Sequence, residues 1–282
     1  MKKTTKWIIG IIVLLVIAVI GWFSFAPQAT TQNEKEVKVG LMSGSKADDE
    51  IWQSVAKTAR EKYKLKLKFV HFTDYTQPNT ALSQHAVDIN SFQHYAFLKN
   101  WNQQHHSNIV SIGDTVITPI RLYSTQYQDV KEIPAGATIA IPNDATNESR
   151  SLQVLKEAGL IKLGGDPHKL LTVKDIKANP KNLNIKEVDA SQTARTLNDA
   201  AAAVVNTNYA QTAHLSPDKT IFKEPLNQQS KPWINLIAAN KEQKHDKDLQ
   251  KVVKAFQTKE TERVIQKNYK GLQVPAWNLK LK

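Results

Sequence analysis

The stretch VKVGLMSGSKADDEIWQSVAKTAREKYKLKLKFVHF (residues 37–72) contains the pattern from which the fold class follows. Its two ends, residues 37–42 and 65–72, are short apolar or alternating runs, which predict strands. Between them, residues 48–62 place apolar side chains at helical spacing, which predicts an amphipathic helix. The order strand, helix, strand is typical of α/β proteins.

The same alternation continues towards the C-terminus of the chain. Strand-like runs lie at 108–124, 138–144, 184–190, 201–210 and 233–240, and helix-like runs at 81–86, 151–161 and 246–269. This alternation predicts α/β layers with a mostly parallel sheet. The length of 282 residues is enough for two such units.

The first 30 residues have a different character. Three lysines within the first six residues precede an uncharged apolar run over residues 7–25, long enough to cross a hydrocarbon core of roughly 30 Å. We predict that residues 1–30 form an uncleaved signal anchor, a transmembrane helix whose basic end faces the cytoplasm, and a cleaved export signal is the alternative. Residues 31–36 would be a tether, and the rest of the chain would lie outside the cell membrane.

The composition excludes several classes of chemistry. The chain has no cysteine, so disulfides, thiol catalysis, cysteine-bound metals and lipid attachment through a thiol are all excluded. Its net charge of +12 comes from lysines scattered along the sequence, without a basic stripe interleaved with aromatic residues. We interpret the charge as solvated surface and expect no nucleic-acid binding.

Polar and aromatic residues gather where predicted strands end. In open α/β sheets, ligands bind beyond the carboxyl ends of the strands, so these clusters are candidate parts of a ligand site. The clusters are FTDY (72–75), SFQH (91–94), PNDATNESR (142–150), VVNTNY (204–209) and PWINL (232–236).

In this order, the five clusters resemble those of the methionine-binding lipoprotein family, the solute receptors of methionine ABC importers. The resemblance covers residues 37 to about 275. It is carried by five motifs: FTDYTQPNTAL (72–82), DINSFQH (88–94), PNDATNESRSL (142–152), VVNTNYA (204–210) and WINLI (233–237).

The resemblance implies a type II periplasmic-binding-protein fold, in which two α/β lobes are joined by two crossover segments. Placing the crossovers near Pro119 and Pro225 gives one lobe from residues 37–118 and 226–282, and a second from residues 119–225. A hinge motion would close the lobes on a ligand. The implied ligand is L-methionine or a similar amino acid. The implied partners are an ABC permease and its ATPase, and neither a cofactor nor enzymatic activity is expected.

Arg150 is the central candidate for ligand binding. The sequence predicts that it lies in the first turn of a helix with Asn147 as N-cap, where a cation opposes the helix dipole and requires a nearby anion. By resemblance, that anion is the carboxylate of an amino acid, bound by the guanidinium fork and backbone N–H groups. The alternatives are a surface arginine and a structural ion pair.

The remaining candidates are amides and rings. Asn206 and Asn235 interrupt apolar strand-like runs, where an unsatisfied amide costs about 1–3 kcal/mol. By resemblance they hold the ammonium and carboxylate of the ligand, and ordinary backbone bonding is the alternative. The walls around the ligand's side chain would come from Phe72, Tyr75, Phe92 and His94, for which core packing is the alternative.

The chain departs from the family pattern in ways that leave the ligand open. It lacks the lipidated cysteine, and Ser149 precedes the arginine where a glycine is expected. The ligand could be methionine, a methionine dipeptide or another apolar amino acid.

Three other functions compete with amino-acid binding. A hydrolase built on Ser91, His94 and Asp88 lacks the G-x-S-x-G elbow. A zinc receptor is suggested by His85, His94, His105 and His106, which lack a fixed ligand spacing. A surface sensor or adhesin on the same fold is the third.

Overall fold

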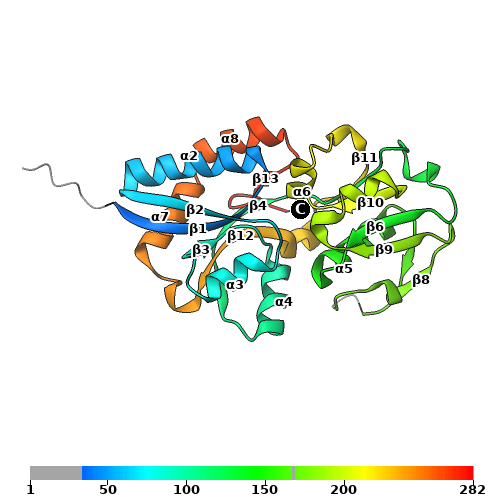
Figure 1. Cartoon of the computed structure of the whole chain (residues 1–282), viewed down its shortest axis with the longest axis horizontal. Coiled ribbons are helices and arrows are strands. Elements are labelled where there is room, and N and C mark those ends of the chain that lie inside the picture. Colours follow the sequence, from blue (N-terminus) through cyan, green and yellow to red (C-terminus); the bar gives the residue numbers. More distant parts are fainter. Residues whose placement is uncertain (1–33, 167–168, 282) are drawn as a thin grey trace, which may run out of the picture. The chain divides into compact units, whose positions relative to one another are not determined.

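The computed structural model describes residues 34–166 and 169–281. Within the compact unit Lys35–Lys282, two main sheets lie side by side, one of six strands and one of five (Figure 1). We call the six-stranded sheet with its helices the first lobe, and the five-stranded sheet with its helices the second lobe. A pair of short strands, β7 (Lys162–Leu163) and β8 (Ile176–Ala178), forms a small third sheet.

The first lobe has the strand order β13-β4-β12-β3-β1-β2. Adjacent residues of β12 face opposite sides of the sheet: Ile237 packs against α2, α7 and α8, and Leu236 packs against α3 and α4. Its strands are β1 (Lys35–Met42), β2 (Leu65–Phe72), β3 (Ile89–Asn90), β4 (Ile109–Ile117), β12 (Ile234–Asn240) and β13 (Val274–Pro275). Its helices are α2 (Lys46–Tyr63), α3 (Gln77–Ser83), α4 (Tyr95–His105), α7 (Lys247–Phe256) and α8 (Lys259–Tyr269).

The second lobe has the strand order β11-β5-β10-β6-β9. Ile139 and Ile141 of β6 pack towards α5, whereas Ala140 between them belongs to a separate cluster on the side of α6. Its strands are β5 (Arg121–Tyr123), β6 (Thr138–Pro142), β9 (Asn184–Val188), β10 (Ala202–Val205) and β11 (Thr220–Lys223). Its helices are α5 (Ala145–Glu157) and α6 (Thr207–Thr212).

The prediction of mostly parallel sheets is wrong. Strands β1, β2 and β3 pair in parallel, as do β6, β9 and β10, but β12 is antiparallel to both β3 and β4. The physical reason is the path of the chain. Strand β4 leaves the first sheet for the second, and β12 returns beside it in the opposite direction, so each sheet combines parallel and antiparallel pairs.

Two local predictions also differ from the structure. The helix predicted over residues 246–269 is two helices, because the chain turns at Gln257 and Thr258, whose side chain caps α8. The first strand begins at Lys35, inside the predicted tether, because Lys35 already pairs with Leu65 of β2.

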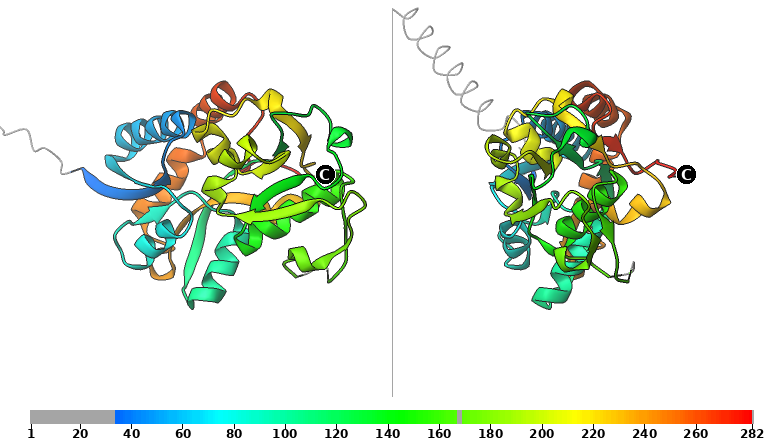
Figure 2. Two further views of the ribbon diagram at one scale, coloured as in Figure 1. Left: turned by 45° about the vertical axis from the view of Figure 1, so that its right-hand side comes forward. Right: turned by 90° about the vertical axis from the view of Figure 1, so that its right-hand side faces the viewer.

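The chain passes between the sheets at residues 118–120 and again at residues 224–233. The lobes are also in direct contact beyond these segments. Met42 at the end of β1 is buried in a cluster made mainly of second-lobe residues such as Tyr209. Helices α4 and α5 contact each other across the two lobes (Figure 2). The structure is therefore a closed form, in which the lobes share apolar surface.

The transmembrane helix predicted for residues 1–30 lies outside the described residues. Among the helices of residues 34–166 and 169–281, none combines the length and the apolar character needed to span a bilayer.

Candidate ligand-binding site

A cavity between the two lobes contains about 1040 Å³ of empty space, including its opening to solvent. Six of the seven predicted site residues line it. Tyr75, Phe92, His94 and Asn235 come from the first lobe, and Arg150 and Asn206 come from the second lobe.

Phe72, the seventh predicted residue, is not among the lining residues. It ends β2 and packs at the edges of two core clusters. Its ring lies so close to Gly40 that a Cβ on that glycine would come within 3.1 Å of it. Phe72 supports the strand ends behind the cavity wall.

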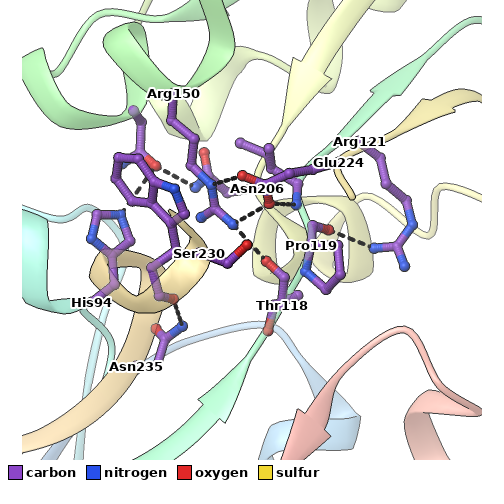
Figure 3. Close-up of polar contacts among 12 residues, drawn as sticks. His94, Thr118, Pro119, Arg121, Arg150, Asn206, Glu224, Ser230 and Asn235 are labelled. Carbon is purple, nitrogen blue, oxygen red and sulfur yellow. Dashed lines mark hydrogen bonds and ion pairs between the residues drawn. The ribbon is translucent and has the colours of Figure 1, made fainter. Parts of the chain in front are cut away.

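Arg150 is paired with a carboxylate of the protein itself. Its Nε donates to Glu224 Oε1 at 2.8 Å, and Nη2 donates to Glu224 Oε2 and to the Thr118 carbonyl at 3.0 Å (Figure 3). The indole ring of Trp233 covers the guanidinium, with Cζ 4.9 Å from the ring centroid. Arg150 and Glu224 are both buried. The anion expected beside Arg150 is thus present in the protein, and it occupies the fork that the sequence assigned to a ligand.

The helix that carries Arg150 begins earlier than the sequence indicated. Helix α5 starts at Ala145, and its N-cap is Asp144, whose Oδ1 accepts the Asn147 N–H at 3.0 Å. The assignment of Asn147 as N-cap is therefore wrong, and Arg150 lies in the second turn. Burial raises the pKa of Asp144, against the effect of the N–H groups that it accepts.

Because Asn147 does not cap the helix, its side chain can face His94 of the first lobe. Its Oδ1 accepts a hydrogen bond from Asn206 Nδ2 at 3.0 Å and faces His94 Nε2 at 3.5 Å. Its Nδ2 donates to both oxygens of Asp144. Asn206 Oδ1 is buried and has no hydrogen-bond partner among the described residues. Because a buried acceptor without a donor costs free energy, this oxygen is suited to a donor on a ligand.

His94 is a neutral hydrogen-bond donor in this site. Its Nδ1 accepts the Phe97 N–H at 3.0 Å and so caps α4, which leaves the proton on Nε2. Burial, with Arg150 as a second cause, lowers the pKa of His94 to about 3. The imidazole therefore carries no charge at neutral pH.

Aromatic rings of the first lobe line the apolar part of the cavity, and Tyr209 of the second lobe packs against one of them, Tyr75. The Tyr75 ring lies 5.9 Å from the Phe92 ring and 5.0 Å from the Tyr209 ring, between centroids. Its hydroxyl donates to Asn208 Oδ1 at 2.6 Å, across the two lobes. Asn208 Nδ2 is buried and has no acceptor in the described part of the chain. Asn208 was the less favoured asparagine of the sequence motif, yet it presents an unsatisfied donor at the cavity.

A buried amide network supports the segment that carries Phe92 and His94. Asn79 Nδ2 donates to Gln93 Oε1 at 2.8 Å, and Gln93 Nε2 donates to Asn79 Oδ1 at 2.7 Å. Asn90 Nδ2 donates to the same Asn79 oxygen at 2.9 Å. All three side chains are buried and hydrogen-bonded to one another, so they fix the backbone from which the two rings project.

The residues proposed for a hydrolase do not form a triad. Asp88 accepts the Lys38 N–H, and His94 directs its Nδ1 to the backbone of its own helix. The zinc alternative has no matching cluster either, because no group of three His, Cys, Asp or Glu side chains suited to a metal occurs within residues 34–166 and 169–281.

Three further residues near the site were not predicted from the sequence: Glu224, Trp233 and Phe97. Glu224 directly precedes Pro225, the predicted crossover, but nothing in the sequence connects it with Arg150. Trp233 belongs to the PWINL cluster, two residues before Asn235, and its membership of that cluster was the available signal. Phe97, whose ring lies 5.6 Å from that of Phe92, continues the aromatic run after SFQH by one helical turn.

Two α/β lobes closed around a cavity, with a buried guanidinium, unsatisfied amides and aromatic walls, define a solute-binding protein of the periplasmic type. The comparisons give the family. Residues 37–277 match the family model described as NlpA lipoprotein, and the chain belongs to that family. Its members are membrane-held substrate-binding lipoproteins rather than enzymes.

The relatives and solved structures agree with this assignment. The chain is 39% identical over 246 residues to the "Probable D-methionine-binding lipoprotein MetQ" of Vibrio cholerae, which covers 87% of this chain and 90% of that protein. It resembles the crystal structure of the substrate-binding protein of a methionine transporter from Streptococcus pneumoniae, with 43% identity and a TM-score of 0.82, over 86% of this chain and 96% of that one. The structure of a nutrient-binding protein from Burkholderia cenocepacia bound to methionine is 43% identical to this chain, with a TM-score of 0.81, over 85% of this chain and 99% of that one.

Proposed function

We propose that this chain captures methionine, or a closely related amino acid or methionine dipeptide, between its lobes and delivers it to an ABC permease with its ATPase. The observation that carries the proposal is the set of unsatisfied polar groups at the cavity. A buried acceptor on Asn206 and a buried donor on Asn208 lack partners among the described residues. A cation, Arg150, lines the same cavity. An α-amino acid offers one ammonium and one carboxylate, which match these groups.

In this arrangement the ligand's ammonium donates to Asn206 Oδ1. Its carboxylate accepts from Asn208 Nδ2 and from Arg150 Nη1, the guanidinium nitrogen that is not committed to Glu224 or Thr118. Asn235, at the start of β12, provides a further amide for the polar end of the ligand. Each bond to a charged group contributes roughly 1.5–3 kcal/mol in a closed site.

The side chain of the ligand lies against Tyr75, Phe92, Phe97 and His94, which all line the cavity. A thioether gains about 0.3–1.5 kcal/mol from contact with aromatic rings in addition to its burial. The Vibrio cholerae relative is named a probable D-methionine-binding lipoprotein and the Burkholderia cenocepacia protein is bound to methionine, which supports methionine among apolar amino acids.

The boundaries of the lobes follow the passages between sheets. We assign residues 37–118 and 226–282 to one lobe and residues 119–225 to the other, with hinges near Pro119 and Pro225. The ends of β4 at Ile117 and of β11 at Lys223 support these positions. Rotation about the two segments opens and closes the cavity.

The chain is attached to the outer side of the membrane through residues 1–30, followed by a short tether. Relatives carry the name lipoprotein, but this chain has no cysteine to carry a lipid. The uncharged run over residues 7–25 supports a protein anchor in its place.

Isothermal titration calorimetry with the purified full-length chain tests the proposal. The ligands are L-methionine, D-methionine, methionine dipeptides, leucine and zinc. We expect tight binding of a methionine-containing ligand and a matching rise in melting temperature, because a ligand that binds only the native state stabilises it. Absence of binding by every methionine-containing ligand, or a melting temperature raised by zinc alone, would refute the proposal.

A further inference from the structure

The carboxylate of Glu224 joins three segments of the protein at one point. Glu224 belongs to the second crossover, and its Oε2 accepts the N–H of Ile120 in the first crossover at 3.1 Å. Both of its oxygens also accept from Arg150 of α5. The backbone N–H of Glu224 donates to the Ile120 carbonyl at 3.0 Å. The acid is 7% exposed, so its side chain, paired with Arg150, lies next to the cavity with little access to water.

We propose that Glu224 sets the net charge of the binding site and thereby makes it select net-neutral zwitterions over charged analogues of the same ligand. This inference rests on the proposed amino-acid-binding function and assigns Glu224 the roles of a specificity-determining and a positioning residue. Glu224 does not touch the ligand. It acts through Arg150.

The charges around the cavity support this role. Among the described residues that line the cavity, Arg150 carries the only fixed positive charge, because His94 is neutral. Asp48 and Asp49 also line the cavity, but they lie in the first turn of α2, where the positive end of the helix dipole offsets their charge. Asp48 also accepts a hydrogen bond from the hydroxyl of Tyr269 at 2.7 Å.

A buried guanidinium without a partner would attract any anion strongly. Glu224 cancels that charge before a ligand arrives. The carboxylate of a ligand then adds a negative charge, which only the ligand's own ammonium offsets. An analogue that has a carboxylate but no ammonium leaves the site with an excess negative charge.

The same contacts determine which part of Arg150 faces the ligand. Glu224 accepts hydrogen bonds from Nε and Nη2, and the Thr118 carbonyl accepts the second hydrogen bond of Nη2. Trp233 covers one face of the guanidinium. The nitrogen left for a ligand is Nη1. The ligand carboxylate is therefore held by one arginine nitrogen and by amides, and the amides set its position.

The experiment compares three ligands with the same thioether side chain by calorimetry on the full-length chain. They are methionine, the anion 2-hydroxy-4-(methylthio)butanoate and the cation methionine methyl ester. We expect wild type to bind methionine at least tenfold more tightly than either charged analogue. In Glu224→Gln, the Kd of the anion relative to that of methionine should fall at least tenfold, about 1.4 kcal/mol. The relative Kd of the ester should rise.

Ratios within one variant are independent of the fraction of protein that is active. Glu224→Asp retains the charge and should keep the wild-type ratios while its affinities for all three ligands fall, because the shorter side chain repositions Arg150. Glu260→Gln is the matched control: it removes the same charge from an exposed position on α8 and should leave the ratios unchanged.

Ratios in Glu224→Gln that stay within twofold of wild type would overturn the inference while the proposed function stands. If Glu224→Gln does not fold, the wild-type chain decides alone, because equal affinity for methionine and its anionic analogue would overturn the inference equally. Failure of wild type to bind methionine at all overturns the proposed function, and the inference with it.

Discussion

Replacement of Arg150 by alanine separates its part in stability from its part in binding. In the folded protein this change leaves the carboxylate of Glu224 buried, with the Ile120 N–H as its remaining hydrogen-bond donor among the described contacts. Breaking a buried ion pair by removing one partner typically costs about 3–5 kcal/mol. For a chain of this size, that corresponds to a fall in melting temperature of roughly 6–20 °C.

The same substitution removes a charge-assisted hydrogen bond to the ligand carboxylate. We expect a loss of at least about 2 kcal/mol in binding free energy, or roughly 30-fold in Kd. The double variant Arg150→Met with Glu224→Leu distinguishes the two effects. It removes both charges, so most of the stability should return, but methionine binding should not.

Urea denaturation and calorimetry measure the two quantities separately. Arg263→Ala is the control, because its pair with Glu260 is exposed and should change stability by no more than about 1 kcal/mol. Near-unchanged affinity in Arg150→Ala would show that Arg150 is a structural residue only. A stability loss as small as that of the control would refute the buried pair itself.

Three further predictions concern the walls and the closure of the cavity. Tyr75→Phe removes the hydrogen bond to Asn208 between the lobes and should weaken methionine binding by roughly 1 kcal/mol in calorimetry, whereas an unchanged Kd would mean that this bond does not support closure. Because the pKa of His94 is lowered to about 3 in the folded protein, the unfolded chain takes up the extra proton as pH falls below about 6.5. Stability should therefore decrease by up to about 1.4 kcal/mol per pH unit below that pH and be insensitive to this group above it, and His94→Gln should reduce the slope in denaturation measured between pH 7 and 5. Gly44→Ala adds a Cβ 2.7 Å from Thr212 of the other lobe, at a residue with φ of +93°. Thermal scans should show a lower melting temperature and calorimetry a weaker affinity for methionine, and wild-type values for both would contradict the contact between the lobes at Gly44.

The sequence could predict the fold class and most of the cavity-lining candidates because both depend on local patterns. Polar clusters follow strands, and an α/β topology brings the ends of those strands together. Tyr75, His94, Asn206 and Asn235 reach one cavity for this reason. Phe72 does not, because its position as the last residue of β2 directs its ring behind the cavity wall.

The rest depends on contacts that no local pattern contains. The partner of Arg150 is 74 residues away, and the pair exists only because both crossovers pass beside α5. The N-cap of α5 is three residues away from the predicted one. Asp144 and Asn147 are both good capping residues, and Asp144 is the cap because its carboxylate accepts from the N–H and the side-chain amide of Asn147. The antiparallel pairs likewise follow from the route of the chain between lobes.

The apolar cluster that Met42 shares with the second lobe affects how the protein works when it is empty. Separation of the lobes exposes that surface to water, so part of the drive to shut exists before any solute arrives. Burial of this surface favours the shut form of the empty protein, and a solute that binds the shut form more tightly raises its population further. Release of a bound solute then requires free energy to separate the lobes, and that free energy must come from an interaction that favours the separated form.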